Sequence, residues 1–406
     1  MFFLALVQSS LGTGAAYVAL VVVAYDRYRS AWAISAVLLA DLLPSMGFGP
    51  ILGAAADRWS RRACLIVADV LRAAAFVAIA FVPGIELTIL LAFVAGVGTA
   101  LFKPAALASL PSLVARENRP AATSLYGAIV DLGFTAGPAI AAVGLLFGSA
   151  ESLLLVNGLT FVVSALLLWR LDFGRRAPSA ESTSHLGLWH ESREGVRAVA
   201  GMPGIRLVIA ASTGALLCAG FFNVAELPFA TEALGTDDAG YSVLVALFGV
   251  GFIAGSLSGA GGGSARLLKR RYIGGILVMA IGFAACGLSS SLGLALATFA
   301  LAGFGNGVLL VNERLLIQET VDDRLQGRVF AISDTLVNWG FGIAFLSAGA
   351  VLSATGPREV VVAAGASALL VGLGMAIALR NHWPAGDEDR GEAEPRPLSR
   401  SAHATR

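Results

Sequence analysis

Residues 53–62 read GAAADRWSRR and follow about twenty almost purely apolar residues. Four of these ten residues are charged: Asp57, Arg58, Arg61 and Arg62. Charge gathered directly behind an apolar run is typical of the point where a membrane-spanning segment ends and the chain turns back. Further apolar runs that end at charged residues lie on both sides of this turn, so the sequence predicts a chain that crosses a membrane many times.

The composition supports a membrane protein. The chain has 406 residues, of which 57% are hydrophobic and 14% charged, and its mean hydropathy is +0.78. These values lie well beyond those of an ordinary soluble domain. A net charge of +1 does not suggest a nucleic-acid partner. The three cysteines are scattered and the four histidines lie in polar segments, so we expect no metal and no cofactor.

Cutting the chain at charged or Gly/Pro-rich breaks gives twelve apolar segments, each near the twenty residues that a membrane span needs. We therefore predict an all-α membrane protein with twelve transmembrane helices. The predicted spans are 2–24, 32–54, 64–83, 87–110, 123–147, 152–171, 205–229, 240–262, 273–290, 292–316, 329–354 and 359–379.

The basic residues predict the orientation. If the N-terminus is cytoplasmic, 22 Lys and Arg residues fall in the inner segments and three in the outer loops. Because cytoplasmic loops carry the excess of Lys and Arg, we expect both termini in the cytoplasm and the chain in the cell (inner) membrane.

A long polar stretch near the middle and a polar segment after residue 380 divide the chain into four parts. We expect six-helix bundles over 1–171 and 205–380, a cytoplasmic linker with an amphipathic helix over 172–204, and a disordered tail over 381–406. The halves resemble each other: Val114 and Val321 follow the fourth and tenth spans, 207 residues apart. Gly53 and Gly259 are 206 residues apart, which predicts two pseudo-symmetric halves.

The pattern Gly-x-x-x-Asp-Arg-x-x-Arg-Arg resembles the signature of the major facilitator superfamily, in which a second Gly stands where this chain has Ser60. ADVLRA at 68–73 and VNGLTF at 156–161 resemble its drug-exporting branch, which includes macrolide efflux pumps and the enterobactin exporter. The resemblance implies a cytoplasmic latch that closes against the start of the eleventh span. Its residues would be Gly53, Asp57, Arg58, Arg61 and Arg62.

The fifth span contains Gly133, Gly137 and Pro138, which resemble the antiporter motif G-x-x-x-G-P-x-x-G-G. Ala141 and Ala142 replace its last two glycines. The alternative is that the glycines serve only close helix packing and the proline only a bend.

Ionisable side chains inside spans are costly and indicate function. Asp41 lies twelve residues before Gly53, about 18 Å along a helix, and Asp131 lies at a similar depth. We predict a proton or substrate site at Asp41, Asp131 and Glu226. The alternative for each carboxyl is a structural hydrogen bond between helices.

Other charges are predicted to lie closer to the cytoplasmic side. Asp69 and Arg72 are three residues apart on one helix, so they pair with each other or with the latch. Lys103 is expected to reach the inner membrane surface. Three further residues are expected to act at the inner gate: Glu313, Arg314 and Asp334.

These observations favour a secondary transporter that exports a small amphipathic molecule, such as a drug, a macrolide-like natural product or a siderophore, in exchange for protons. No ATP-binding loop of the form G-x-x-x-x-G-K-(S/T) occurs, so the energy would come from a gradient. Acidic groups without a basic partner at mid-membrane favour neutral or cationic cargo. The bilayer and protons are the other expected partners, and we expect a working monomer.

Three alternatives stay open. A lipid or lysolipid flippase of the same fold is the nearest, and a cavity open sideways to the bilayer would favour it. A non-transporting receptor or scaffold would need neither the latch nor the duplicated halves. A membrane enzyme would need a nucleophile–base pair or a metal cluster, so we do not expect an enzyme.

Overall fold

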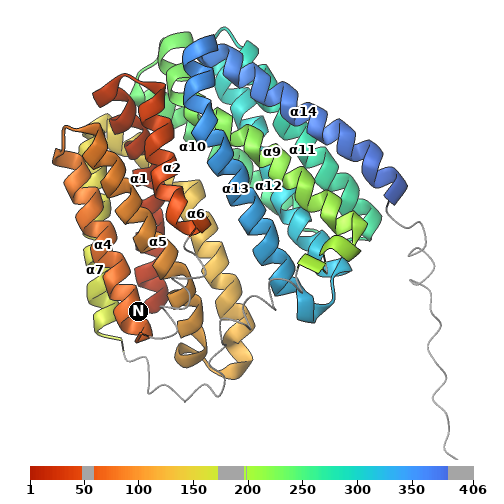
Figure 1. Ribbon diagram of the computed structural model, residues 1–406, viewed down its shortest axis with the longest axis horizontal. Helices are drawn as coiled ribbons and strands as arrows, with labels where there is room; N and C mark the ends of the chain where they lie inside the picture. Colours follow the sequence, from red (N-terminus) through yellow and green to blue (C-terminus); the bar gives the residue numbers. More distant parts are fainter. Residues whose placement is uncertain (48–58, 172–195, 198, 383–406) are drawn as a thin grey trace, which may run out of the picture.

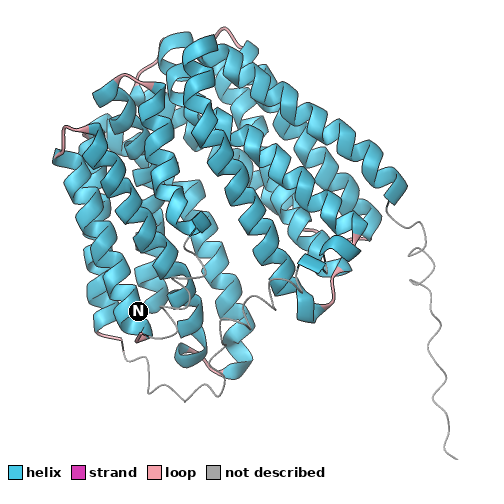
Figure 2. Cartoon of the chain, viewed as in Figure 1, coloured by secondary structure: helices cyan, strands magenta, loops and turns pink. Residues whose placement is uncertain are grey.

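The computed structural model describes residues 1–47, 59–171, 196–197 and 199–382. Within these ranges every regular element is a helix (Figure 2). Eleven of the described helices are long and apolar enough to cross a membrane. The second predicted span corresponds to a shorter apolar helix, described up to Gly47, where the undescribed residues 48–58 begin. The predicted all-α membrane fold is confirmed.

The helices form two bundles that lie side by side (Figure 1). The first contains α1 (Phe2–Tyr28), α2 (Ala31–Gly47), α4 (Arg61–Phe81), α5 (Ile85–Leu113), α6 (Arg119–Phe147) and α7 (Ala150–Trp169), with the 3-10 turn η1 (Arg116–Asn118). The second contains α9 (Pro203–Pro228), α10 (Asp238–Gly259), α11 (Ala265–Leu288), α12 (Leu292–Thr320), α13 (Asp323–Thr355) and α14 (Pro357–His382), with the π-helical turn η2 (Phe229–Ala233).

Successive helices run in opposite directions, so each bundle has two ends. We call the end with the α1–α2 turn the Trp32 end, and the end where α4 begins the Arg61 end. The N-terminus lies at the Arg61 end (Figure 1).

The start of α11 differs from the prediction. The helix begins at Ala265 instead of 273 and includes the basic run 266–271. Ser264 caps it, because its hydroxyl accepts the backbone N–H of Leu267 at 3.4 Å. Leu268 is fully buried, and the ammonium of Lys269 donates to the carbonyl of Leu379 at 3.5 Å. A boundary placed by charge alone was wrong here because buried and basic residues alternate in the first turns.

The expected linker helix lies mostly outside the described residues, as does most of the expected tail. From the linker, Val199 is buried and belongs to a small apolar cluster with Ile205, Ile209, Ile317 and Val329. This cluster lies at the Arg61 end, where α9, α12 and α13 begin or end.

Backbones of neighbouring helices touch through glycine. In the first bundle a Cβ added at Gly14 of α1 would collide with the carbonyl of Gly133 in α6, and one at Gly137 would collide with the backbone of Gly14. Helices in a membrane gain no hydrophobic energy from leaving lipid, so close packing of small residues is a main source of their association. Gly133 and Gly137 therefore have a clear packing role.

The offset of 207 residues that relates the two halves of the sequence also relates their helix contacts. A Cβ at Gly96 of α5 would collide with the carbonyl of Asp41 in α2, and a Cβ at Gly303 of α12 would collide with that of Phe248 in α10. Gly96 and Gly303 are 207 residues apart, as are Asp41 and Phe248. The two bundles thus use the same interhelical contact at equivalent positions.

Arginine side chains cover equivalent helix ends in both bundles, although they come from different helices. Arg27 of α1 donates to the carbonyl of Ala80 at 3.3 Å, near the end of α4. Arg358 of α14 donates to the carbonyl of Gly287 at 2.8 Å, near the end of α11. The last carbonyls of a helix have no hydrogen-bond partner inside the helix. A cation there stabilises the helix end in two ways, by donating hydrogen bonds to these carbonyls and by interacting favourably with the helix dipole.

We expect Gly137→Val to lower the free energy of unfolding by about 1–3 kcal/mol, because the added methyl groups force α1 and α6 apart. Thermal unfolding in lipid nanodiscs, followed by intrinsic fluorescence, measures this. Gly127→Val in the same helix is the control, because nothing lies within 4 Å of a Cβ at Gly127. Equal melting temperatures for the two variants would contradict the packing role.

Candidate functional site between the two bundles

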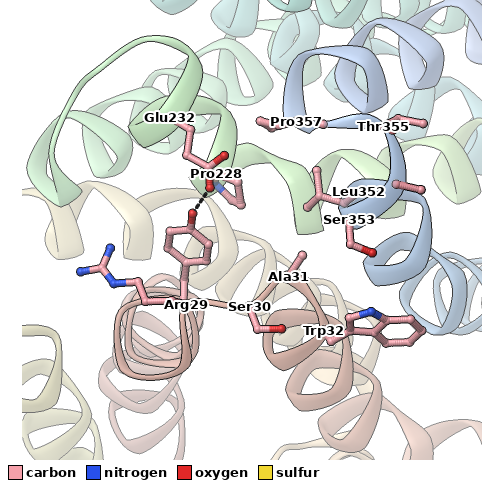
Figure 3. A pocket seen from close by; sticks show the side chains of 13 residues that line it. Arg29, Ser30, Ala31, Trp32, Pro228, Glu232, Leu352, Ser353, Thr355 and Pro357 are labelled. Atoms are coloured by element: carbon pink, nitrogen blue, oxygen red, sulfur yellow. Dashed lines mark hydrogen bonds between the residues drawn. The ribbon is translucent and has the colours of Figure 1, made fainter.

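At the Trp32 end the two bundles meet around a pocket of about 490 Å³ (Figure 3). α1 and α2 line one wall with Tyr25, Arg29 and Trp32, and α13 and η2 line the other. The hydroxyl of Tyr25 donates a hydrogen bond to the carboxylate of Glu232 across the interface. Tyr25 is buried, so this bond closes the Trp32 end on one side of the pocket.

Two of the three predicted carboxyls lie near enough to Tyr17 of α1 for their charges to act on its hydroxyl. They are Asp41 of α2 and Glu226 of α9, and neither forms a hydrogen bond with that hydroxyl. Glu226 is 3% exposed and accepts a hydrogen bond from Tyr241 at 2.8 Å. The Tyr17 hydroxyl is buried and has no hydrogen-bond partner among the described residues. Buried polar atoms are nearly always satisfied, so this hydroxyl is available to a transported group or water.

The third predicted carboxyl lies elsewhere. Asp131 of α6 forms an ion pair with Arg314 of α12 at 3.2 Å, and its side chain is 42% exposed. A second ion pair joins Lys103 of α5 to Asp334 of α13 at 3.6 Å. Both pairs connect the first bundle to the second.

One prediction is corrected by these pairs. Lys103 has Asp334 of the other bundle as its partner, and its expected reach to the inner membrane surface stays a prediction. Arg314 gives Asp131 a basic partner, so the argument that the carboxyls favour neutral or cationic cargo does not hold. The interface between the bundles carries both signs of charge.

Glu313 was expected at the gate but lies inside the second bundle. It is 6% exposed, and its two carboxyl oxygens lie at hydrogen-bond distance, 2.7 Å each, from Ser212 Oγ of α9 and Ser333 Oγ of α13. Its chain neighbour Arg314 faces the first bundle. One turn of α12 therefore presents a buried carboxyl and an exposed cation on different sides.

Asp69 and Arg72 form an ion pair with each other within the first bundle. The guanidinium of Arg72 stacks between Phe102 and Phe161, 4.4 and 4.3 Å from the ring centroids. Asp41 also acts electrostatically on Arg72. Asp69 and the two aromatic faces thus hold the guanidinium of Arg72 in place, where it also attracts the carboxylate of Asp41.

The latch is described only in part, because Gly53, Asp57 and Arg58 lie outside the described residues. Ser60 caps α4: its hydroxyl accepts the backbone N–H of Ala63 at 3.1 Å. Serine is a strong N-cap, which explains how it can stand where the family signature has glycine. Arg62 donates to the carbonyl of Trp169 at the end of α7. This contact ties α4 to its own bundle.

Sequence reasoning missed the two tyrosines, Tyr17 and Tyr241. Each stands in an apolar span, and a tyrosine in such a span must still satisfy its hydroxyl. That signal was present, but nothing in the sequence indicates that residues 17, 41, 226 and 241 come together from four helices.

Two bundles of membrane-crossing helices, joined by ion pairs, with the buried Glu226 and the half-buried Asp41 facing Tyr17 from different bundles, define a membrane transporter. The model of the Major Facilitator Superfamily matches residues 2–225 and 208–404. The chain therefore belongs to the major facilitator superfamily, as the signature predicted.

Relatives and solved structures agree with this assignment. The chain is 26% identical over 388 residues to the multidrug efflux pump Tap of Mycolicibacterium fortuitum, covering 91% of this chain and 92% of Tap. It is 30% identical over 122 residues to macrolide efflux protein A of Streptococcus pyogenes, covering 29% and 30%. A bacterial homologue of the human lysosomal transporter Spinster has the same fold, with a TM-score of 0.73, 15% identity, and coverage of 94% and 97%.

We expect Tyr241→Phe to lower the free energy of unfolding by about 1–3 kcal/mol, because it leaves the buried carboxyl of Glu226 without its donor. Chemical unfolding in nanodiscs measures the change. Tyr17→Phe removes a hydroxyl that makes no hydrogen bond within the described protein, so it is the matched control and leaves stability nearly unchanged. An equal loss in both variants would contradict the role given to Tyr241.

Proposed function

We propose that this chain is a proton-coupled exporter of a small amphipathic molecule, and that its two bundles rock about the interface between them. The observation that carries this proposal is the contrast between two kinds of contact. Within a bundle, backbones pack directly through glycine. Between the bundles the glycine contact is less close, because a Cβ at Gly349 of α13 would lie 3.1 Å from the Cα of Trp32. Ion pairs with exposed side chains also join α6 to α12 and α5 to α13 there.

This contrast supports rocking because the two kinds of contact differ in strength. Exposed ion pairs contribute about 0–1 kcal/mol each, so breaking them costs little. Forcing apart a packed helix pair costs more. Each bundle therefore moves as a unit, and the ion pairs at the interface are among the contacts exchanged during transport.

The Arg61 end is the cytoplasmic one in this proposal. The excess of Lys and Arg at that end supports this orientation. The Tyr25–Glu232 hydrogen bond at the Trp32 end would then close the outer side. At the level of Asp131 and Arg314, side chains are 42% and 59% exposed, which is consistent with access from the cytoplasm.

Protons would bind at Asp41 and Glu226, next to the unpaired hydroxyl of Tyr17. A carboxyl at membrane depth changes charge when it takes a proton, and that change alters the affinity for cargo beside it. The similarity to Tap and to macrolide efflux protein A supports a drug-like or natural-product cargo. The ion pairs of both signs are compatible with cargo of either charge.

Transport is tested in inverted vesicles with a lumenal pH dye and a respiration-driven proton gradient. Cationic drugs, macrolides, siderophores and lysolipids are added one at a time. We expect one of these compounds to dissipate the gradient, and Asp41→Asn to abolish that response, because the amide cannot bind the proton. Glu117→Gln, at an exposed position in η1, is the control and keeps the response.

Two results would overturn the proton-coupled proposal. One is unchanged proton-dependent transport in the double variant Asp41→Asn with Glu226→Gln. The other is movement of labelled lysolipid without a pH gradient, which would replace the exporter by a flippase.

Rocking is tested by cross-linking across the Trp32 end. In a background with Cys64, Cys218 and Cys286 replaced by Ala, Tyr25→Cys and Glu232→Cys are joined by a flexible bifunctional thiol reagent. We expect transport to stop, because the two bundles can no longer separate there. The control pair is Arg27→Cys with Glu151→Cys, which joins α1 and α7 of one bundle. Full transport after joining residues 25 and 232 would rule out opening at this end.

A further inference from the structure

Glu313 belongs to a chain of hydrogen bonds that links four helices of the second bundle. Its Oε2 lies 2.7 Å from Ser212 Oγ, and Ser212 Oγ lies 2.8 Å from the hydroxyl of Tyr272 in α11. That hydroxyl lies 2.8 Å from the carbonyl oxygen of Val208. The other carboxyl oxygen, Oε1, lies 2.7 Å from Ser333 Oγ. All four distances are those of O–H···O hydrogen bonds.

Four contacts between oxygens require four hydrogens. The hydroxyls of Ser212, Tyr272 and Ser333 supply one hydrogen each, and the carbonyl of Val208 supplies none. With an ionised carboxylate, one contact would join two oxygens with no hydrogen between them, which is repulsive at 2.8 Å. A hydrogen on Glu313 Oε2 completes the set. Glu313 then donates to Ser212, Ser212 to Tyr272, and Tyr272 to Val208, while Ser333 donates to Oε1.

We propose that Glu313 is a proton-binding site, occupied in this structure, whose loss of the proton loosens the ion pairs between the two bundles. The bond that breaks is the O–H of the carboxyl, and the proton passes to water. The ligand is the proton itself. The site is separate from the cluster around Tyr17, because its hydrogen-bond partners all lie within the second bundle.

The charged surroundings of Glu313 explain the link to the interface. The titratable or charged groups that face it in the described residues are Tyr272 of α11, Asp334 of α13 and Arg314 of α12. α9 contributes the hydroxyl of Ser212. α10 carries its titratable side chains, Asp238 and Tyr241, near its start at the Trp32 end.

Two of these neighbours are partners in the interbundle ion pairs. Arg314 follows Glu313 in α12 and pairs with Asp131; Asp334 follows Ser333 in α13 and pairs with Lys103. A negative charge on Glu313 attracts Arg314 and repels Asp334. The missing hydrogen also leaves a repulsive contact between two oxygens, either between α9 and α12 or between α9 and α11. Both effects weaken the two ion pairs. That weaker ion pairs help the bundles to move in transport rests on the proposed function, whereas the protonation of Glu313 does not.

The test is infrared spectroscopy of the purified full chain in nanodiscs at pH 7, in H2O and D2O, which detects the carbonyl stretch of a protonated carboxyl. We expect wild type to show such a band and Glu313→Gln to lack it. Glutamine preserves the network, because its amide nitrogen donates to Ser212 and its oxygen accepts from Ser333. We therefore expect this variant to fold and to melt close to wild type. Glu226→Gln is the control and keeps the Glu313 band.

A second variant keeps the test decisive if Glu313→Gln does not fold. Ser212→Ala retains the carboxyl but removes its acceptor, so the band moves to higher frequency. Identical spectra of wild type and Glu313→Gln, or an unmoved band in Ser212→Ala, would overturn the proposal. The readout needs no transport. The two proposals can fail separately. If Glu313→Gln loses the band but transport by wild type does not depend on the pH gradient, proton-coupled export is refuted and the proton site at Glu313 remains.

Discussion

The fold depends on direct contact between helix backbones. Inside a bilayer, an apolar side chain gains little by moving from lipid to another helix, so association depends on how closely the backbones can approach. Gly14 and Gly137 provide this approach between α1 and α6, and Gly96 provides it between α2 and α5. Because these positions lack a Cβ, carbonyl groups of one helix lie against the Cα atoms of the next. Each bundle is consequently a rigid unit.

Rigid bundles place the chemistry at their borders. Asp41 is held in position by its own backbone, which packs on Gly96, so its side chain has a fixed place beside Tyr17 and Arg72. Glu226 is held from the other bundle by Tyr241. The two carboxyls thus belong to different bundles, and the proposed rocking would change the surroundings of the Tyr17 hydroxyl, on which both carboxyls act.

Much of the fold could be predicted from sequence because span length, charge asymmetry and the signature at residues 53–62 are local properties. The start of α11 could not, since charge alone marked the boundary while the cap at Ser264 and the buried Leu268 decided it. For the site, depth along a helix identified Asp41 and Asp131 as charges inside spans. Depth does not say which way a side chain points around the helix, so the pairing of Asp131 with Arg314 and the burial of Glu313 required the structure.

The duplication explains why the two halves are similar in packing yet different in chemistry. At an offset of 207 residues, Gly96 corresponds to Gly303, but Asp41 corresponds to Phe248. In the other direction, Glu313 corresponds to Ala106 and Tyr272 to Leu65. The glycines that hold the bundles are therefore shared, whereas the carboxyls, the half-buried Asp41 and the buried Glu313, occur in one half each. A symmetric scaffold with different charges in its two halves allows each side of the interface to respond to its own ligand. A transporter needs this if cargo and protons are to favour different orientations of the same two bundles.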